Sequence, residues 1–282
     1  MWQVRHSALF ALPAILSRLP PSQRRALALE TIITLSKDNS ATVRSGVLEA
    51  LGEVLYTFHE DEDGPPVQLL QLFLGREDKR VRDSSQPRAD QSQDLENNSR
   101  ETLLESFYND PSRPLVCAFN YPAVALTLGR NRWPELREAY LHIASDKSFR
   151  VRRTLAASLG ELAKIIGAEN AQRDLVGIWW DSIHSEEGDV RVKAVECVSD
   201  FVLMLGSDAG ADIIRGLHAI WEGGGFKSWR ERHDIAKALM SFASSPGGQS
   251  ASSSVRGLLR KALEDSVAAV REAAITSVSS VT

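Results

Sequence analysis

The stretch SDKSFRVRRTLAASLGELAKIIG, residues 145–167, decides the fold of this chain. Its apolar residues recur at spacings of three and four, which is typical of one buried face of an α-helix. Those residues are Leu155, Leu159, Leu162 and Ile166. Arg150, Arg152 and Arg153 crowd the start of this helix, where the helix dipole disfavours positive charge. The stretch therefore predicts an amphipathic helix whose arginines serve another purpose, either nucleic-acid binding or a structural role.

The pair Val151-Arg152 belongs to a repeat that runs through the chain. Related arginines follow at intervals of 39 to 41 residues in two runs, one formed by Arg5 and Arg44, the other by Arg152, Arg191, Arg232 and Arg271. Counted from the residue before each arginine, apolar residues recur at positions 4, 8, 11 and 15. A helical unit repeated at this period predicts a solenoid, in which each unit buries its apolar face against its neighbours.

A second set of apolar helical patterns lies between these segments. They cover residues 22–37, 134–144, 171–184, 208–221 and 252–263, and no segment shows sustained strand alternation. Each unit is thus expected to hold a helix A, a short turn and a helix B that begins at the arginine. The predicted fold class is all-α, an α-solenoid of antiparallel helical hairpins.

One interval in the repeat is too long. Arg44 and Arg152 are 108 residues apart, and the surplus over two units lies in a polar segment that is nearly free of apolar residues. We expect helical repeats over 1–75 with a truncated first hairpin, a disordered polar insertion over 76–110, and repeats of the same solenoid over 111–282. Residues 114–129 should supply the missing helix B, with Pro122 kinking or interrupting it. Because the chain begins and ends inside a helix B, we expect it to be a fragment of a longer array.

The arginines are expected to be structural, because in three copies an aspartate lies six residues before the arginine. Such an aspartate can cap the helix and offset the charge of an arginine in its own or a neighbouring turn. The predicted ladder residues are Asp38, Arg44, Asp146, Arg152, Arg191, Arg232, Asp265 and Arg271. Residues 222–229, before Arg232, contain a single acid, Glu222, which predicts a break in the ladder there.

Partner contacts are expected on the turns between helices A and B. Phe149 and Phe226 are the predicted exposed aromatics, although each has the alternative of packing on its own hairpin. Trp180 is a possible interface anchor, since the adjacent Trp179 continues the buried face. Arg150 and Arg153 lie outside the repeat register and are therefore free for a partner. The remaining candidates from these turns are Asn39 and Lys147.

Composition and motifs argue against catalysis. The net charge of −4 argues against a general polyanion binder and leaves room for a local basic patch. Two cysteines in apolar contexts cannot build a disulfide framework or a four-ligand zinc site. The six histidines are scattered, and no phosphate-binding loop or nucleophile elbow occurs. We therefore expect no catalytic, cofactor-binding or metal-binding residues, no membrane segment, and a cytoplasmic or nuclear location.

The succession of helix A, an Asp-containing turn, Val-Arg and helix B resembles the HEAT repeat. More narrowly, FNYPAVALTLGRNRW, residues 119–133, and DKSFRVRRTLAASLGELAKIIG, residues 146–167, resemble regulatory subunits of protein phosphatase 4, which are relatives of the protein phosphatase 2A scaffold subunit. This resemblance implies a non-catalytic scaffold. Its partner would be a serine/threonine phosphatase catalytic subunit of type 4 or 2A, together with substrate proteins that the scaffold helps to choose.

Two other classes of helical-repeat protein stay open. An importin-like transport receptor would be expected to be much longer and more acidic than this chain. A nucleic-acid-binding repeat protein would need the arginines free and facing outward, whereas their period and their nearby acids favour a structural role. Nucleic acid is therefore not an expected partner.

Overall fold

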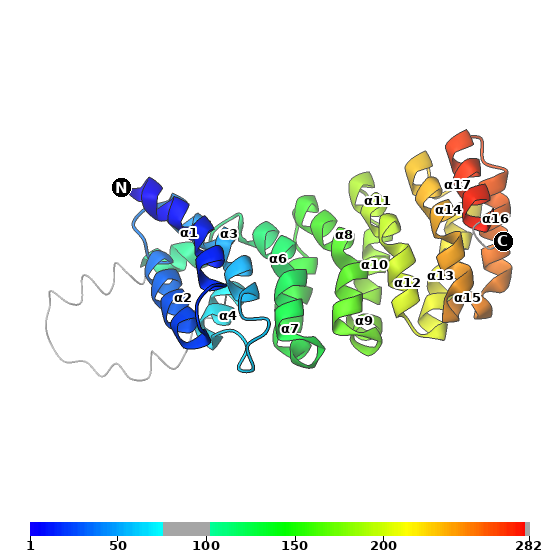
Figure 1. Ribbon diagram of the computed structural model, residues 1–282. Coiled ribbons are helices and arrows are strands. Elements are labelled where there is room, and N and C mark those ends of the chain that lie inside the picture. The colour runs from blue at the N-terminus through cyan, green and yellow to red at the C-terminus, as the bar shows by residue number, and fades with distance from the viewer. Residues whose placement is uncertain (76–101, 280–282) are drawn as a thin grey trace, which may run out of the picture. The chain divides into compact units, whose positions relative to one another are not determined.

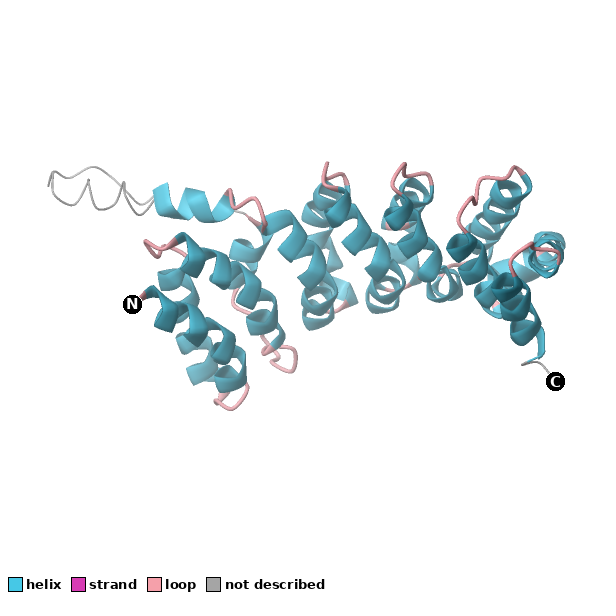
Figure 2. Cartoon of the chain, turned by 90° about the horizontal axis from the view of Figure 1, so that it is seen from above, coloured by secondary structure: helices cyan, strands magenta, loops and turns pink. Residues whose placement is uncertain are grey.

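The computed structural model describes residues 1–75 and 102–279, and the described residues contain helices and turns but no strand. The chain divides into two compact units, residues 1–140 and 141–282. Within each unit, antiparallel helical hairpins stack in chain order (Figure 1). The short turns that join the helices lie at the ends of the hairpins (Figure 2). The predicted all-α solenoid architecture is confirmed.

The first unit is built on three B helices. They are α1 (Trp2–Leu16), α3 (Ala41–Tyr56) and α6 (Arg113–Leu128), and α3 packs against both of the others. The A helices are α2 (Pro21–Leu35), α4 (Val67–Leu74) and α7 (Trp133–Ala144), which follows the 3₁₀ turn η1 (Arg130–Arg132) and runs into the second unit. The predicted missing helix B is therefore α6. It continues through Pro122 and is not interrupted there.

The second unit repeats the same arrangement. Its B helices are α8 (Phe149–Ile166), the pair α11 (Gly188–Glu196) and α12 (Val198–Met204), α14 (Trp229–Ser244) and α17 (Ala268–Ser279). Each packs on the next in that order. The A layer holds α9 (Ala168–Asp174), α10 (Val176–Ile183), α13 (Ser207–Glu222), α15 (Pro246–Ser250) and α16 (Ser252–Leu263).

The predicted apolar face is buried in the middle copies of the repeat. In α8 the residues Leu155, Leu159, Leu162 and Ile166 are all buried, and the equivalent positions of α3, α12 and α14 are buried as well. The first copy differs, since α1 buries Leu9, Leu12 and Leu16 and leaves Ile15 exposed. α1 packs on α2 and α3.

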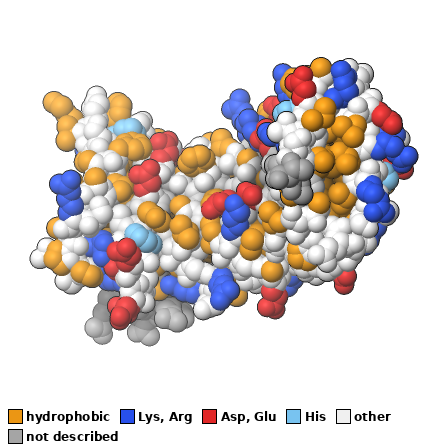
Figure 3. Space-filling model, turned by 45° about the vertical axis from the view of Figure 1, so that its right-hand side comes forward, with side chains coloured by type: hydrophobic (Ala, Val, Ile, Leu, Met, Phe, Trp, Pro, Cys, Tyr) orange, Lys and Arg blue, Asp and Glu red, His pale blue; other side chains and the backbone are white. Residues whose placement is uncertain are grey.

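The last described helices also leave apolar side chains in solvent. These are Leu263 of α16 and Ile275 and Val278 of α17. Figure 3 shows apolar side chains gathered on the C-terminal side of the second unit. The repeated apolar positions are therefore buried where a helix packs between two others, as α14 does within the second unit, and less so in α17.

The boundary of the predicted insertion requires a correction. Residues 76–101 lie outside the described part of the chain, but residues 102–108 form a short helix rather than disordered chain. Phe107 of this helix is buried, and the guanidinium of Arg113 lies over its ring at 4.8 Å from the ring centre. Leu103, Leu104 and Phe107 have helical spacing, so a local apolar anchor explains why the segment folds.

Glycines allow the closest helix contacts in the second unit. α13 and α15 meet at Gly210 and Gly247, and a Cβ on Gly247 would lie 2.4 Å from the main-chain nitrogen of Ala211. A Cβ on Gly216 of α13 would lie 2.2 Å from the ring of Trp180. Because real Cβ atoms do not approach that closely, a larger residue at Gly247 would force α13 and α15 apart, and one at Gly216 would displace the Trp180 ring.

Candidate functional site

Each ladder arginine closes the turn that precedes its own helix. Arg152 donates from Nη1 to the carbonyl oxygens of Asp146 and Lys147, at 2.8 and 2.9 Å. Four other arginines make the same contact with the carbonyl six residues before them, namely Arg44, Arg191, Arg232 and Arg271. These carbonyls follow the end of helix A, where backbone acceptors have no helical partner. The arginine thus fixes the turn within its hairpin.

The other edge of the guanidinium joins one hairpin to the next. Arg152 Nη2 lies 2.8 Å from Glu187 Oε1, and Arg191 Nε lies 2.9 Å from Glu231 Oε1. The same link joins Arg5 to Asp38 at 2.6 Å and Arg232 to Asp265 at 2.6 Å, while Arg44 donates to the hydroxyl of Ser106. We call this set of contacts the arginine ladder. One arginine side chain therefore joins two consecutive helical hairpins.

Of the two predicted pairings, the side chains form the one between neighbouring turns and not the one within a single turn. Arg44, Arg152 and Arg271 bind the main-chain oxygens of Asp38, Asp146 and Asp265, not their carboxylates. Each carboxylate instead accepts the N–H two residues further on, at Ser40, Ser148 and Val267. An aspartate in this conformation shapes its own turn. The carboxylates of Asp38 and Asp265 also accept hydrogen bonds from the arginine of the preceding hairpin, Arg5 or Arg232.

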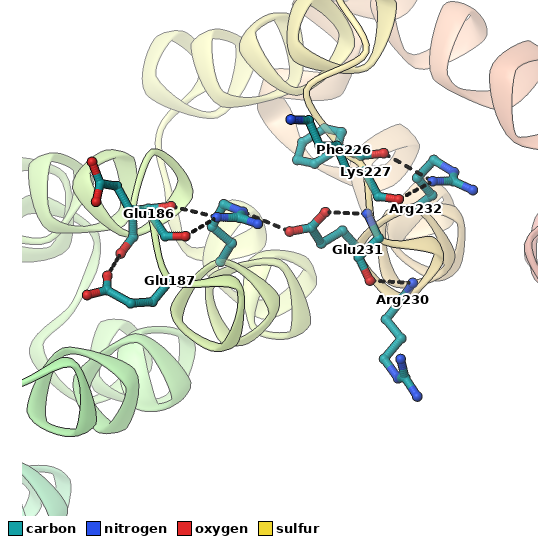
Figure 4. Close-up of polar contacts among 10 residues, drawn as sticks. Glu186, Glu187, Phe226, Lys227, Arg230, Glu231 and Arg232 are labelled. Carbon is teal, nitrogen blue, oxygen red and sulfur yellow. Dashed lines mark hydrogen bonds and ion pairs between the residues drawn. The ribbon is translucent and has the colours of Figure 1, made fainter.

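The predicted break in the ladder before Arg232 is wrong, because Glu231 supplies the carboxylate that Arg191 binds there. Its side chain is 0% exposed, and its two oxygens receive Arg191 Nε at 2.9 Å and the Ser228 N–H at 3.2 Å (Figure 4). Ser228 and Glu231 form a capping box at the start of α14. The acid comes from the helix itself rather than from the turn, which is why a search of the turn alone misses it.

Three carboxylates of the ladder have pKa values below their usual range. The pKa of Glu187 falls to about 2, because the Ser185 hydroxyl and then Arg152 hydrogen-bond to its ionised form. The pKa of Asp38 is lowered chiefly by Arg5. Burial acts to raise the pKa of Asp265, but the bonds from Arg232 and Val267 outweigh it and the pKa lies below its usual value. All three groups therefore favour the folded state when ionised.

Acid is expected to weaken the Glu187 rung in a defined pH window. Since the folded-state pKa of about 2 lies below the ordinary value of 4.5, the stabilisation is full above pH 4.5 and is lost as the pH falls toward 2. Melting temperatures of the natural chain and Glu187→Gln should differ at neutral pH and converge across that window. A difference that stays constant with pH would contradict an ionic role for Glu187.

The predicted contact residues fall into two groups. Asn39, Lys147, Phe149, Arg150 and Arg153 are exposed on the first turns of α3 and α8 or just before them. Asn39 and Lys147 also give their carbonyl oxygens to the ladder arginines. All five side chains are therefore exposed, and their contact with a partner stays a prediction.

Phe226 and Trp180 differ in how far their side chains are buried. Phe226 is only 5% exposed and packs edge-on against Trp221, with 6.4 Å between ring centres, so its predicted exposure is wrong. Trp180 is half-buried, since one side of its ring contacts Trp179 and Gly216 of α13. The hairpin packing predicted as the alternative holds for Phe226.

The exposed aromatic equivalent to Phe149 is Trp229. Each stands directly after a serine at the start of a B helix and three residues before a ladder arginine, Arg152 or Arg232. Trp229 is 39% exposed and Phe149 is 41% exposed. Alignment on the arginine would have found Trp229, whereas alignment on the turn selected Phe226.

Other chemical sites receive no support from the described residues. Burial raises the pKa of the Cys117 thiol to about 11 and that of Cys197 to about 12, so both thiols are protonated at neutral pH. Within residues 1–75 and 102–279, no group of three or more His, Cys, Asp or Glu side chains could hold a metal ion. None of the helices described is both long and apolar enough for a bilayer crossing.

Comparison with known proteins identifies relatives among phosphatase regulators. Residues 117–220 match the family model of the protein phosphatase 4 regulatory subunit 1 middle domain. Serine/threonine-protein phosphatase 4 regulatory subunit 1 of Homo sapiens is 29% identical over 216 residues, which is 73% of this chain and 21% of the relative. The Mus musculus protein of the same name is 35% identical over 150 residues, or 50% of this chain and 16% of the relative. The chain spans about a fifth of the human relative's length, and over these regions it resembles protein phosphatase 4 regulatory subunit 1.

Proposed function

We propose that this chain acts as a non-catalytic regulatory subunit that binds a serine/threonine phosphatase catalytic subunit of type 4 or 2A and directs its choice of substrate. The observation that carries the proposal is the match of residues 117–220 to the middle domain of a named phosphatase regulator. The stacked hairpins support it, because such a stack presents a long series of turns to other proteins. The proposed location is the cytoplasm or the nucleus.

The exposed first turn of α8 is the proposed contact with the partner. It lies inside the matched region and offers Phe149, Arg150 and Arg153. Neither arginine forms an ion pair within the described part of the chain, whereas Arg152 between them is held by the ladder. An exposed aromatic beside unpaired arginines has the composition of an interface hot spot.

Retention of a purified phosphatase catalytic subunit by the immobilised chain tests this function. We expect type 4 or type 2A catalytic subunit to be retained, and Phe149→Ala combined with Arg150→Ala to reduce retention about tenfold or more. Arg260→Ala on the exposed side of α16 is the matched control and should retain the natural level. Failure of a chain with intact helical circular dichroism to retain either catalytic subunit would contradict the proposal.

A further inference from the structure

Two first turns of the second unit carry the same four-residue pattern. Lys147-Ser148-Phe149-Arg150 spans the start of α8, and Lys227-Ser228-Trp229-Arg230 spans the start of α14. Both patterns stand in the same register to their ladder arginines, Arg152 and Arg232, and one hairpin lies between them. We call these two segments the paired turns. The turns that begin α11 and α17 lack the pattern.

The paired turns expose cations that have no acidic partner. In the described residues no ion pair is formed by Lys147, Arg150, Arg153, Lys227 or Arg230, and all five are exposed. The guanidinium of Arg230 lies over the ring of Trp229, 4.8 Å from its centre. Figure 4 shows the Arg230 side chain directed away from Glu231, the carboxylate that the ladder uses. The aromatic and basic groups of each turn are therefore available together.

An acidic turn separates the two basic ones. α11 packs between α8 and α14, and Glu186 just before α11 and Asp189 in its first turn are exposed. The edge of the second unit thus presents positive, negative and positive charge in succession. Since packed helices lie about 8–10 Å apart, Phe149 and Trp229 should be separated by about 16–20 Å.

We propose that the paired turns form a docking surface for a segment of a partner protein with an acidic–basic–acidic charge pattern. An extended segment of about six residues spans the distance between the aromatic rings. Its acidic ends would pair with Arg150 and Arg230, and its central basic residue would face Glu186 and Asp189. The charge pattern of the docked segment follows from these side chains alone, and only the identity of the partner rests on the proposed function.

The acidic turn decides between a protein segment and a nucleic acid. A nucleic acid carries negative charge at every phosphate, so a strand that reached from Phe149 to Trp229 would pass over Glu186 and Asp189. Like charges placed opposite each other cost binding free energy and suppress the wrong partner. A peptide that places a lysine at this point gains from the same two carboxylates.

Fluorescence polarisation with synthetic peptides tests the proposal on the full chain. The probe has paired glutamates at each end and a central lysine, and its control has the same composition with the glutamates contiguous. We expect Phe149→Ala with Arg150→Ala, and Trp229→Ala with Arg230→Ala, each to weaken binding of the probe about tenfold or more. Glu186→Lys with Asp189→Lys should reverse the preference toward the contiguous peptide. Arg260→Ala should leave both affinities unchanged.

Two results would overturn the proposal. One is probe affinity that survives alanine substitution at either turn in a chain with an unchanged melting temperature. The other is tighter binding of a single-stranded oligonucleotide than of the probe at the same residues. Phosphatase retention on the same samples separates this inference from the proposed function. Retention without probe binding defeats the inference alone, and probe binding without retention defeats the proposed function alone.

Discussion

Trp179→Ala is expected to lower the free energy of unfolding of the second unit by about 4 kcal/mol, in the range for a fully buried tryptophan. The side chain is 0% exposed and its indole N–H donates to the carbonyl oxygen of Ala194 at 2.9 Å. Its ring also stacks on Phe201, with 6.4 Å between ring centres. Because Trp179 joins helix α10 to both α11 and α12, its loss opens a cavity. The Ala194 carbonyl then keeps only the weaker thiol donor of Cys197, at 3.3 Å.

The adjacent Trp180 supplies a matched control. Its ring contacts Trp179 edge-on with 4.9 Å between centres, and part of it faces solvent. Trp180→Ala should therefore cost about 1–2 kcal/mol, since less apolar area returns to water. Chemical denaturation followed by far-ultraviolet circular dichroism measures both variants. A cost for Trp180→Ala equal to that for Trp179→Ala would contradict the assignment of Trp179 to the core.

Glu231→Ala is expected to cost about 3 kcal/mol, at the lower end for breaking a buried ion pair. The substitution removes the acceptor of Arg191 Nε and half of the capping box with Ser228. Arg191 keeps its bonds to the carbonyl oxygens of Ser185 and Glu186, so the turn before α11 should hold. The lost stability thus comes from the contact between consecutive hairpins and from the cap at the start of α14.

Two further substitutions isolate the cause. Glu231→Gln keeps an oxygen for the Ser228 N–H but gives up the charge, and it should cost about 1–2 kcal/mol. Glu161→Ala removes an exposed ion pair with Lys164 and should change the free energy of unfolding by less than about 0.5 kcal/mol. Thermal and denaturant unfolding of the three variants measures these differences. Equal costs for Glu231→Ala and Glu161→Ala would show that the ladder rung at Glu231 adds no stability.

The region that matches the family model covers only one of the paired turns. The matched region ends at residue 220, so it includes the turn of Phe149 but not the turn of Trp229. If both turns bind one partner segment, a chain cut to the matched region would keep one anchor only. The difference in peptide affinity between the full chain and the shortened chain then measures what the turn of Trp229 contributes to binding.

The sequence by itself determined the all-α class, the repeat period and the buried face of the central helices. These features are local, because helical periodicity and a recurring arginine can be read within one unit. The tertiary structure alone decided what each arginine binds beyond its own turn, since the carboxylates lie 33 to 40 residues further along the chain. It also decided that Phe226 is buried while Trp229 is exposed, and that residues 102–108 fold. A local pattern tells which face of a helix is apolar, but the side chains of the neighbouring unit determine which groups are covered and which carboxylate completes the rung.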